Sequence, residues 1–367
     1  MKVVIIGAGP AGLMSAISIK KHHPEYDVII LEKDLDIGSR IKISGNGRCN
    51  FINNHLDSCH YSSTFVEKIN YFQHDVMKLL NEVGFQYYYD EEGRAYPLSE
   101  TANTLIQVFK TLITHYQVSV KTSYQVTSID ISHKILINNE IECDRLVVCI
   151  GGISYLNERL NYNKIVSDLN LSVTNLSPSL APLSVNSFSR ELENKRVKCL
   201  VKLLYKNDVL KEEYGEVLFK KDGLSGIVIF NMSAILARQH LSNYHDYQIS
   251  LDLLPQYNNK QISEIYKLNP TLDHVFGKEI ASYLLSLNNP LLKIKDLRFN
   301  LRGIYEFKNS QVTSGGVMLN QINDDLSLKK DSRIYLGGEF LDIDGDCGGY
   351  NIGYAMCSGY LIGKFIK

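Results

Sequence analysis

Residues 1–33 contain two short apolar runs separated by a glycine-rich turn and a longer segment. This order is typical of a strand, a helix and a second strand. Residues 2–6 (KVVII) and 27–31 (DVIIL) are short, mostly apolar runs, as expected of strands buried on both faces. Between them, residues 11–21 predict a helix that begins directly after the glycine-rich turn GAGPAG. The pattern therefore predicts a βαβ unit, the first step of an α/β fold.

The segment that follows adds further helices and strands. Residues 64–84 carry apolar side chains at helical spacing and end at a glycine, and residues 101–114 predict another helix. Residues 86–98 (QYYYDEEGRAYPL) alternate around a turn, which predicts a hairpin. Residues 145–152 (RLVVCIGG) indicate a buried strand that ends in paired glycines.

From about residue 184 the pattern changes to long alternating stretches that predict antiparallel strands, followed by helical periodicity between prolines. The chain then returns to a buried strand at 333–338 (RIYLGG) and a final helix at 351–366. We therefore predict one discontinuous domain, residues 1–183 and 311–367, interrupted by a β-rich substrate domain at 184–255 and a helical cap subdomain at 256–310.

Composition and charge narrow the class of protein. The 367 residues are 44% hydrophobic and 22% charged, as in ordinary globular proteins. The formal net charge is −1, and the basic residues form no stripe that would neutralise a nucleic-acid backbone. The spacing of the seven cysteines matches neither a redox pair nor a zinc site, as expected of free thiols in a reducing cytoplasm. No segment approaches the ~20 apolar residues that span a bilayer. We expect a cytoplasmic protein with no nucleic-acid and no membrane partner.

The first turn carries a dinucleotide-binding fingerprint. Gly7, Gly9 and Gly12 form a G-x-G-x-x-G motif between a strand and a helix, where glycines permit a tight turn and a close approach to a pyrophosphate. Glu32 ends the next strand, placed to accept hydrogen bonds from ribose hydroxyls. The candidate cofactor-binding residues of this region are Gly7, Gly9, Pro10, Ala11, Gly12, Glu32 and Lys33.

A second glycine-rich loop, residues 337–353 (GGEFLDIDGDCGGYNIG), precedes the final helix. A protein that binds NAD alone has little need of such a loop, whereas FAD is long and its isoalloxazine must be held by other segments. A helix N-terminus near Asn351 offers backbone N–H groups and partial positive charge to the N1/C2 region of a flavin. FAD is therefore the predicted cofactor.

Several motifs, taken in order, resemble the aminoacetone oxidase family of FAD-binding enzymes, within the glutathione-reductase-type flavoprotein folds. The motifs are GAGPAGLMSAI, LEK, GSRIKISGNGRCNFIN, EEGRAYPLS, GLSG, VTSGGV and GGEFLDIDGDCGGYNIGYAMCSG, and they run nearly end to end. The resemblance implies an α/β, doubly wound FAD-binding Rossmann-type domain with an inserted mixed β domain and a small helical subdomain.

The resemblance also implies that the loop around residues 43–53 follows the cofactor to the reactive edge of the flavin. There Gly45 and Gly47 would let the backbone lie against the ring, Arg40 or Arg48 would meet the pyrophosphate, and Ser44 would reach the N5 edge. Asn50 would fix the loop, and Cys49 is interpreted as a small packing residue. The remaining cofactor candidates are Val126, Gly151, Gly152, Gly338, Glu339, Gly348, Gly349, Tyr350, Asn351 and Ile352.

The activity implied by the resemblance is oxidation of a small primary amine, such as aminoacetone or an amino acid, with hydride transfer to flavin N5 and O2 reduced to H2O2. Because the sequence holds no second dinucleotide fingerprint for NADPH, direct oxidation is preferred. Two alternatives stay open: an NAD(P)H-dependent reductase of a small organic or steroid-like substrate, and a non-catalytic flavin redox sensor. No catalytic residue is predicted, because the ten histidines lie outside the motifs.

Overall fold

The computed structural model describes residues 1–154, 159–186, 188, 190–241 and 243–367. The chain divides into two compact units. The first unit comprises Met1–Leu176 and Val312–Lys367, and the second unit comprises Ser177–Gln311. Both ends of the chain therefore belong to one unit, and the second unit is a single insertion into it.

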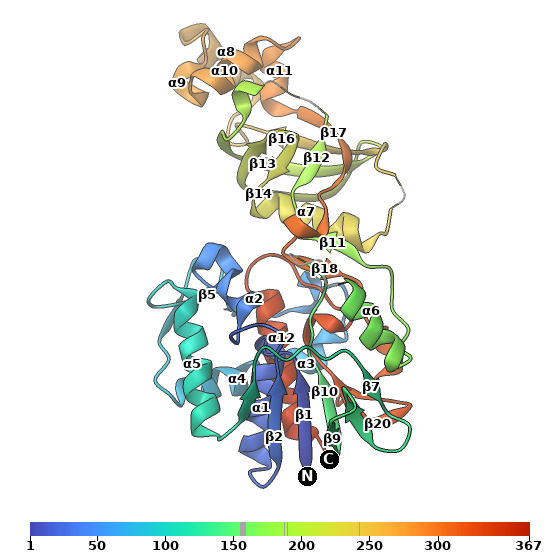
Figure 1. Cartoon of the computed structure of the whole chain (residues 1–367). Coiled ribbons are helices and arrows are strands. Elements are labelled where there is room, and N and C mark those ends of the chain that lie inside the picture. The colour runs from blue at the N-terminus through green and yellow to red at the C-terminus, as the bar shows by residue number, and fades with distance from the viewer. Residues whose placement is uncertain (155–158, 187, 189, 242) are drawn as a thin grey trace. The chain divides into compact units, whose positions relative to one another are not determined.

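A six-stranded sheet of order β19-β20-β10-β1-β2-β6 forms the centre of the first unit (Figure 1). Pairing is parallel from β20 through to β6, while β19 runs antiparallel to β20 at the edge. The predicted βαβ unit is present, since the neighbouring strands β1 and β2 are connected by α1. The bounds of these elements are β1 (Lys2–Ile6), α1 (Pro10–His22), β2 (Asp27–Leu31), β6 (Ser119–Lys121), β10 (Arg145–Val148), β19 (Ser327–Leu328) and β20 (Asp331–Leu336).

Helices and two small sheets complete the first unit. The helices are α2 (Ser39–Lys42), α3 (Val66–Asn70), α4 (Gln73–Asn81), α5 (Ala102–His115), α6 (Arg159–Asp168) and α12 (Tyr350–Phe365). The short strands are β3 (Ile52–Asn53), β4 (Tyr87–Tyr89), β5 (Arg94–Pro97), β7 (Ile129–Asp130), β8 (Ile135–Ile137), β9 (Ile141–Cys143) and β18 (Val312–Ser314). The strands β4 and β5 form the predicted hairpin, to which β3 is added.

The first and last helices of the chain, α1 and α12, pack side by side (Figure 1). Small residues allow this contact, because a Cβ at Gly359 would collide with the Ala11 carbonyl oxygen and one at Gly363 with the Ser18 side chain. The Ser18 hydroxyl donates to the Tyr360 carbonyl oxygen at 2.8 Å. This close packing holds the start of α1 against the second half of α12.

The second unit contains a closed barrel of order β12-β15-β14-β13-β16-β17. Its strands are β12 (Leu183–Val185), β13 (Arg196–Tyr205), β14 (Asp208–Lys220), β15 (Gly223–Ser225), β16 (Tyr247–Asp252) and β17 (Leu297–Ile304), with β11 (Ser177–Ser179) before them. The helices are α7 (Ile227–Arg238), α8 (Asn259–Leu268), α9 (Asp273–Phe276), α10 (Lys278–Leu285) and α11 (Pro290–Lys295). Buried side chains such as Leu203, Phe219 and Ile249 give the unit its own core.

The predicted fold class is confirmed, while some predicted boundaries differ. The helix expected at 64–84 is divided into α3 and α4, because Phe72 (φ −88°, ψ 8°) leaves the helical path although the apolar spacing continues. The insertion begins at Ser177 and ends at Gln311, and it contains both the barrel and α8–α11. The separation of residues 184–255 from 256–310 as two domains stays a prediction.

Candidate cofactor site

The turn between β1 and α1 has the shape that a phosphate-binding loop requires. Gly7 has φ +100°, and a Cβ there would lie 2.5 Å from the Cys149 carbonyl oxygen. A Cβ at Gly12 would collide with the Gly7 carbonyl oxygen. In contrast, a Cβ at Gly9 would meet nothing within 4 Å. Gly7 and Gly12 are thus needed for the turn itself, and open space lies beside Gly9, where the predicted pyrophosphate would bind.

The beginning of α1 is available to an anion. Gly9 is the residue before the helix, Pro10 starts it, and no side chain caps it. The first N–H groups of a helix have no partner within the helix, and this end carries partial positive charge. Ala11 lies against the C-terminal segment, since a Cβ on Gly338 would come within 2.9 Å of the Ala11 Cβ. The two predicted glycine-rich segments therefore meet at this point.

Glu32 directly follows β2 and is buried, with its carboxylate close to the phosphate turn. One oxygen accepts from the Ala8 backbone N–H at 2.6 Å and the other from the Asp34 N–H at 2.9 Å. Each carboxylate oxygen can accept a further hydrogen bond, so a ribose hydroxyl remains a possible partner. Glu32 also fixes the protein backbone, which sequence reasoning did not predict. The neighbouring Lys33 pairs with Asp34 at 2.8 Å.

The loop that follows α2 has a tight backbone and a buried thiol. A Cβ at Gly45 would lie 2.9 Å from the Asn50 backbone nitrogen, whereas Gly47 has open space beside it. The Ser44 hydroxyl donates to the Ile41 carbonyl oxygen at 2.7 Å. Burial raises the pKa of the Cys49 thiol to about 12, with a smaller opposing effect from Ser44. Cys49 therefore stays protonated near neutral pH, which supports its interpretation as a packing residue.

Arg48 and Arg40 have different surroundings. The Arg48 guanidinium donates to Glu100 at 2.7 Å and to the Tyr88 hydroxyl at 3.0 Å, and it lies 4.7 Å from the centre of the Tyr96 ring. These contacts direct it to the β4–β5 hairpin. Arg40, on α2, is instead close enough to Glu339 to lower the pKa of that carboxyl group. Of the two arginines, Arg40 is the one that the structure brings to other predicted cofactor residues.

Glu339 lies against the paired glycines that follow β10. A Cβ at Gly152 would be 2.5 Å from a Glu339 carboxylate oxygen, and that oxygen accepts from the Thr313 backbone N–H at 2.6 Å. Burial raises the pKa of Glu339, and this effect outweighs the opposing effects of the Thr313 N–H and Arg40. Gly151, Gly152, Gly338 and Glu339 therefore come together as predicted candidates from two distant segments.

The start of α12 is joined to the loop of residues 43–53. Gly349 has φ +90°, and a Cβ there would lie 2.5 Å from both the Ile52 carbonyl oxygen and the Asn50 side chain. With its amide oriented to satisfy both partners, the Asn50 side chain accepts from the Gly349 N–H at 3.2 Å and donates to Ile52 at 3.3 Å. Asn50 thus fixes this loop, but to α12. The space on the Cα of Gly349 is filled by protein atoms.

Other side chains fix the loop before α12. Asn351 donates to the carbonyl oxygens of Gly345 and Asp346 and accepts from the Gly345 N–H at 2.8 Å. Tyr350 stacks on His60, with 4.4 Å between ring centres. No side chain caps α12, and Ile352 lies in its first turn, partly exposed. Gly348 lies beside the Tyr350 ring, and Val126 is buried in the segment after β6.

Two residues near these segments were not predicted from the sequence. His60 directs Nδ1 to Asp346 at 3.2 Å, and the pairing of Tyr61 with Gly345 brings the two together. Tyr162, on α6, is buried beside Phe340. No motif marks either residue, because each is brought to the site by contacts between distant segments.

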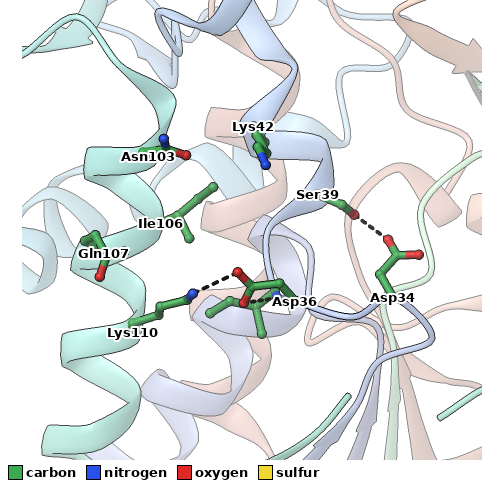
Figure 2. Close-up of a pocket in the computed structure, with 9 residues that line it drawn as sticks. Asp34, Asp36, Ser39, Lys42, Asn103, Ile106, Gln107 and Lys110 are labelled. Carbon is green, nitrogen blue, oxygen red and sulfur yellow. Dashed lines mark hydrogen bonds and ion pairs between the residues drawn. The ribbon is translucent and has the colours of Figure 1, made fainter. Parts of the chain in front are cut away.

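A separate pocket lies between α5 and the segment that joins β2 to α2 (Figure 2). Lys110 of α5 pairs with Asp36 across it at 2.8 Å, and Ser39 donates to Asp34 at 2.6 Å. The nine residues that line the pocket include none of the predicted cofactor residues. Because none of the predicted cofactor residues lines it, we do not identify this pocket with the cofactor site.

Together, the open space beside Gly9, the uncapped start of α1 and the buried carboxylate of Glu32 fit the pyrophosphate and ribose of a dinucleotide. The fold and this site define a FAD-dependent oxidoreductase. The chain belongs to the family described as HI0933-like protein Rossmann domain, whose model matches residues 1–365. The cofactor is FAD.

Curated relatives cover almost the whole chain. One is the 3-dehydro-bile acid delta(4,6)-reductase of Clostridium scindens, 25% identical over 99% of this chain and 98% of its own length. Another is the ribosomal RNA dihydrouridine synthase of Haemophilus influenzae, 25% identical over 97% of this chain and 96% of its own. These names do not refer to aminoacetone, so that part of the resemblance stays a prediction.

Solved structures share the fold at low sequence identity. The 3-ketosteroid delta1-dehydrogenase of Sterolibacterium denitrificans is 10% identical, with a TM-score of 0.51 over 99% of this chain and 98% of that one. A quinol fumarate reductase variant of E. coli is 13% identical, with a TM-score of 0.52 over 99% and 69%. Among the described residues, no helix is long and apolar enough to cross a membrane.

Proposed function

We propose that the protein uses NAD(P)H and FAD to reduce a conjugated carbon–carbon double bond in a small organic molecule. The observation that carries the proposal is the match, over 97% or more of the chain, to relatives named for a bile-acid delta(4,6)-reduction and for dihydrouridine synthesis. Both names denote the saturation of a double bond conjugated to a carbonyl group. The reductase alternative is therefore better supported than the amine oxidase.

The charge of the chain favours a small molecule over ribosomal RNA as the substrate. Lysine and arginine number 39 against 40 acidic residues, and they are scattered. RNA binding is driven largely by basic side chains that contact phosphates. A substrate without a phosphate backbone suits this near-neutral chain better.

The reaction adds one hydride and one proton across the double bond, while NAD(P)H is oxidised to NAD(P)+. Bound FAD would supply the two-electron carrier between the two substrates. The proton requires a donor beside the site, and we assign this role to His60. Its Nδ1 is held against Asp346 at 3.2 Å and its ring against Tyr350, so Nε2 is the nitrogen to which we assign the proton transfer.

Amine oxidation remains the second candidate function. The observation that favours it is that, in the described part of the chain, one parallel sheet of dinucleotide-binding type is present, while the second unit contains an antiparallel barrel. An oxidase needs no site for a nicotinamide dinucleotide, because O2 takes the electrons. A reductase must instead bind NAD(P)H transiently.

Anaerobic mixing of the FAD-loaded protein with NADPH or with aminoacetone would distinguish the two candidates. We expect NADPH to bleach the yellow protein and a steroid-like dienone to restore the colour with saturation of one double bond. Bleaching by aminoacetone alone would establish the oxidase, and no bleaching by either donor would favour the redox sensor.

The role of His60 is tested in the same assay by His60→Gln. We expect bleaching by NADPH at the parent rate and slower recovery with the dienone. The exposed His274, which lies in α9 of the second unit, provides the matched control as His274→Gln. Equal recovery rates for all three proteins would remove His60 from the mechanism.

A further inference from the structure

Tyr162 carries a polar atom that the protein leaves unsatisfied. Its side chain is 3% exposed, and its hydroxyl is one of four buried side-chain atoms without a hydrogen-bond partner in the described part of the chain. Nearly all buried polar groups in native proteins are bonded to protein or water. A buried hydroxyl without a partner therefore points to a group that binds there.

The position of Tyr162 relates this hydroxyl to the cofactor site. The Tyr162 ring packs edge-on against Phe340, with 5.3 Å between ring centres, and Phe340 directly follows Glu339 in η6 (Gly338–Phe340). Glu339 is also near enough to act on the Tyr162 hydroxyl electrostatically. Glu339 in turn contacts Gly152. Tyr162 thus belongs to the same cluster as the candidates that follow β10 and β20.

The other unsatisfied atoms lie elsewhere. They are His23 Nε2, after the end of α1, Asn70 Oδ1 in α3, and Asn269 Nδ2 in the second unit. In the described part of the chain, none of these three residues forms a hydrogen bond, an ion pair or a ring contact with Glu339 or the paired glycines. The unsatisfied hydroxyl at the Glu339 cluster is therefore specific to Tyr162.

The phenol is suited to donate a hydrogen bond. Burial raises the pKa of Tyr162, and the nearby carboxylates of Glu339 and Asp342 act in the same direction. The hydroxyl therefore keeps its proton at neutral pH and needs an acceptor. FAD carries many acceptors, among them ribityl hydroxyls, phosphate oxygens and flavin carbonyls.

We propose that Tyr162 is a cofactor-binding residue whose hydroxyl donates to an acceptor atom of bound FAD. The apoprotein then buries an unsatisfied hydroxyl, and FAD binding satisfies it. This inference depends on the FAD site and is independent of the substrate that the enzyme reduces or oxidises.

The test is Tyr162→Phe, which removes only the oxygen atom. Because the hydroxyl has no partner without the cofactor, we expect the apoprotein variant to unfold at an unchanged or higher urea midpoint. We expect its Kd for FAD, measured by quenching of flavin fluorescence, to rise about three- to tenfold through loss of one hydrogen bond. This combination of effects separates a ligand contact from a structural role.

Tyr335→Phe is the matched control. Tyr335 is also buried in the first unit, but its hydroxyl accepts from the Lys367 backbone N–H at 3.3 Å. We expect this variant to lose apoprotein stability and to keep the parent Kd for FAD. An unchanged Kd in Tyr162→Phe would overturn the proposal. So would a lower urea midpoint of its apoprotein, which would show a structural water or protein partner instead.

Discussion

At the scale of single residues, Gly9 and Gly12 belong to the same motif but are required for different reasons. Gly9 has open space beside it and an extended backbone (φ −78°, ψ −177°) that alanine also adopts. Gly12 has no such space, because its Cβ would collide with the Gly7 carbonyl oxygen. A predicted ligand contact and an observed packing requirement therefore lie three residues apart.

Alanine at each position should separate these two requirements. For Gly9→Ala we expect a nearly unchanged urea midpoint and a Kd for FAD that rises roughly tenfold, since the methyl group occupies the space for the pyrophosphate. For Gly12→Ala we expect the apoprotein to lose about 2 kcal/mol or more of stability. Urea unfolding and flavin titration of both variants provide the measurement. Equal loss of stability in both would show that the space beside Gly9 is not available.

The carboxyl group of Glu339 should make the stability of the apoprotein depend on pH. Burial raises its pKa above the ordinary value of 4.5, so the folded state binds this proton more tightly than the unfolded state. The stabilising contribution is present below pH 4.5 and is lost as the pH rises through the raised pKa. Above that range the folded protein carries the cost of a desolvated carboxylate.

Glu339→Gln removes this titration and keeps an acceptor for the Thr313 N–H. We expect the stability of the parent apoprotein, relative to this variant, to decrease as the pH rises above 4.5. Urea midpoints of both proteins over a series of pH values give the comparison. A relative stability that stays constant, or that increases with pH, would contradict the raised pKa.

At the scale of elements, the start of α12 is where the structure gives a different reason for a glycine than its predicted contact with the flavin. From the sequence, Gly349 is expected either to bring its backbone against the flavin or to adopt a backbone angle that favours glycine. In the structure its φ of +90° and its contacts with Ile52 and Asn50 already require glycine. Gly349→Val would therefore disturb packing whether or not a flavin is near. The proximity of the helix end to the flavin needs a test that leaves this contact unchanged.

Ile352→Asp provides that test, since Ile352 is partly exposed in the first turn of α12. A negative charge there opposes the partial positive charge of the helix end. If that end faces the N1/C2 region, the anionic reduced flavin is destabilised and the reduction potential becomes more negative. A change of 0.3–1 kcal/mol corresponds to roughly 6–20 mV for two electrons.

Ile352→Asn is the neutral control of similar shape. We expect spectroelectrochemical titration to give a lower potential for the aspartate variant than for the asparagine variant, with FAD fully bound to both. Equal potentials would place the start of α12 away from the flavin.

The sequence predicted elements well where local patterns are sufficient. The apolar runs of β1 and β2 and the glycines of the first turn are local signals, and they led to the confirmed βαβ unit. The break between α3 and α4 was missed, because the apolar spacing continues across Tyr71 and Phe72. The partners of Arg48 and the pair of His60 with Asp346 were also missed. They depend on segments that meet only after folding, and no spacing along the chain records such contacts.

At the scale of the whole molecule, the FAD-binding unit is assembled from both ends of the chain. The parallel neighbours β10 and β20 come from opposite sides of the insertion, and α1 packs along α12. The first unit therefore cannot complete its sheet until the chain has passed through Ser177–Gln311. The insertion has no such dependence, because its barrel closes within its own sequence.

This difference predicts that residues 177–311 fold alone and bind no FAD. The closed barrel leaves no open sheet edge, and the buried core of Val201, Leu251 and Leu284 is contributed entirely by this segment. All predicted cofactor residues lie in the first unit.

We expect the isolated fragment to show cooperative urea unfolding by circular dichroism and no visible flavin absorbance after purification or incubation with FAD. The full chain, treated identically, should retain FAD. Flavin bound to the fragment would place part of the cofactor site in the insertion, and a fragment without a cooperative transition would show that the barrel depends on the first unit for its stability.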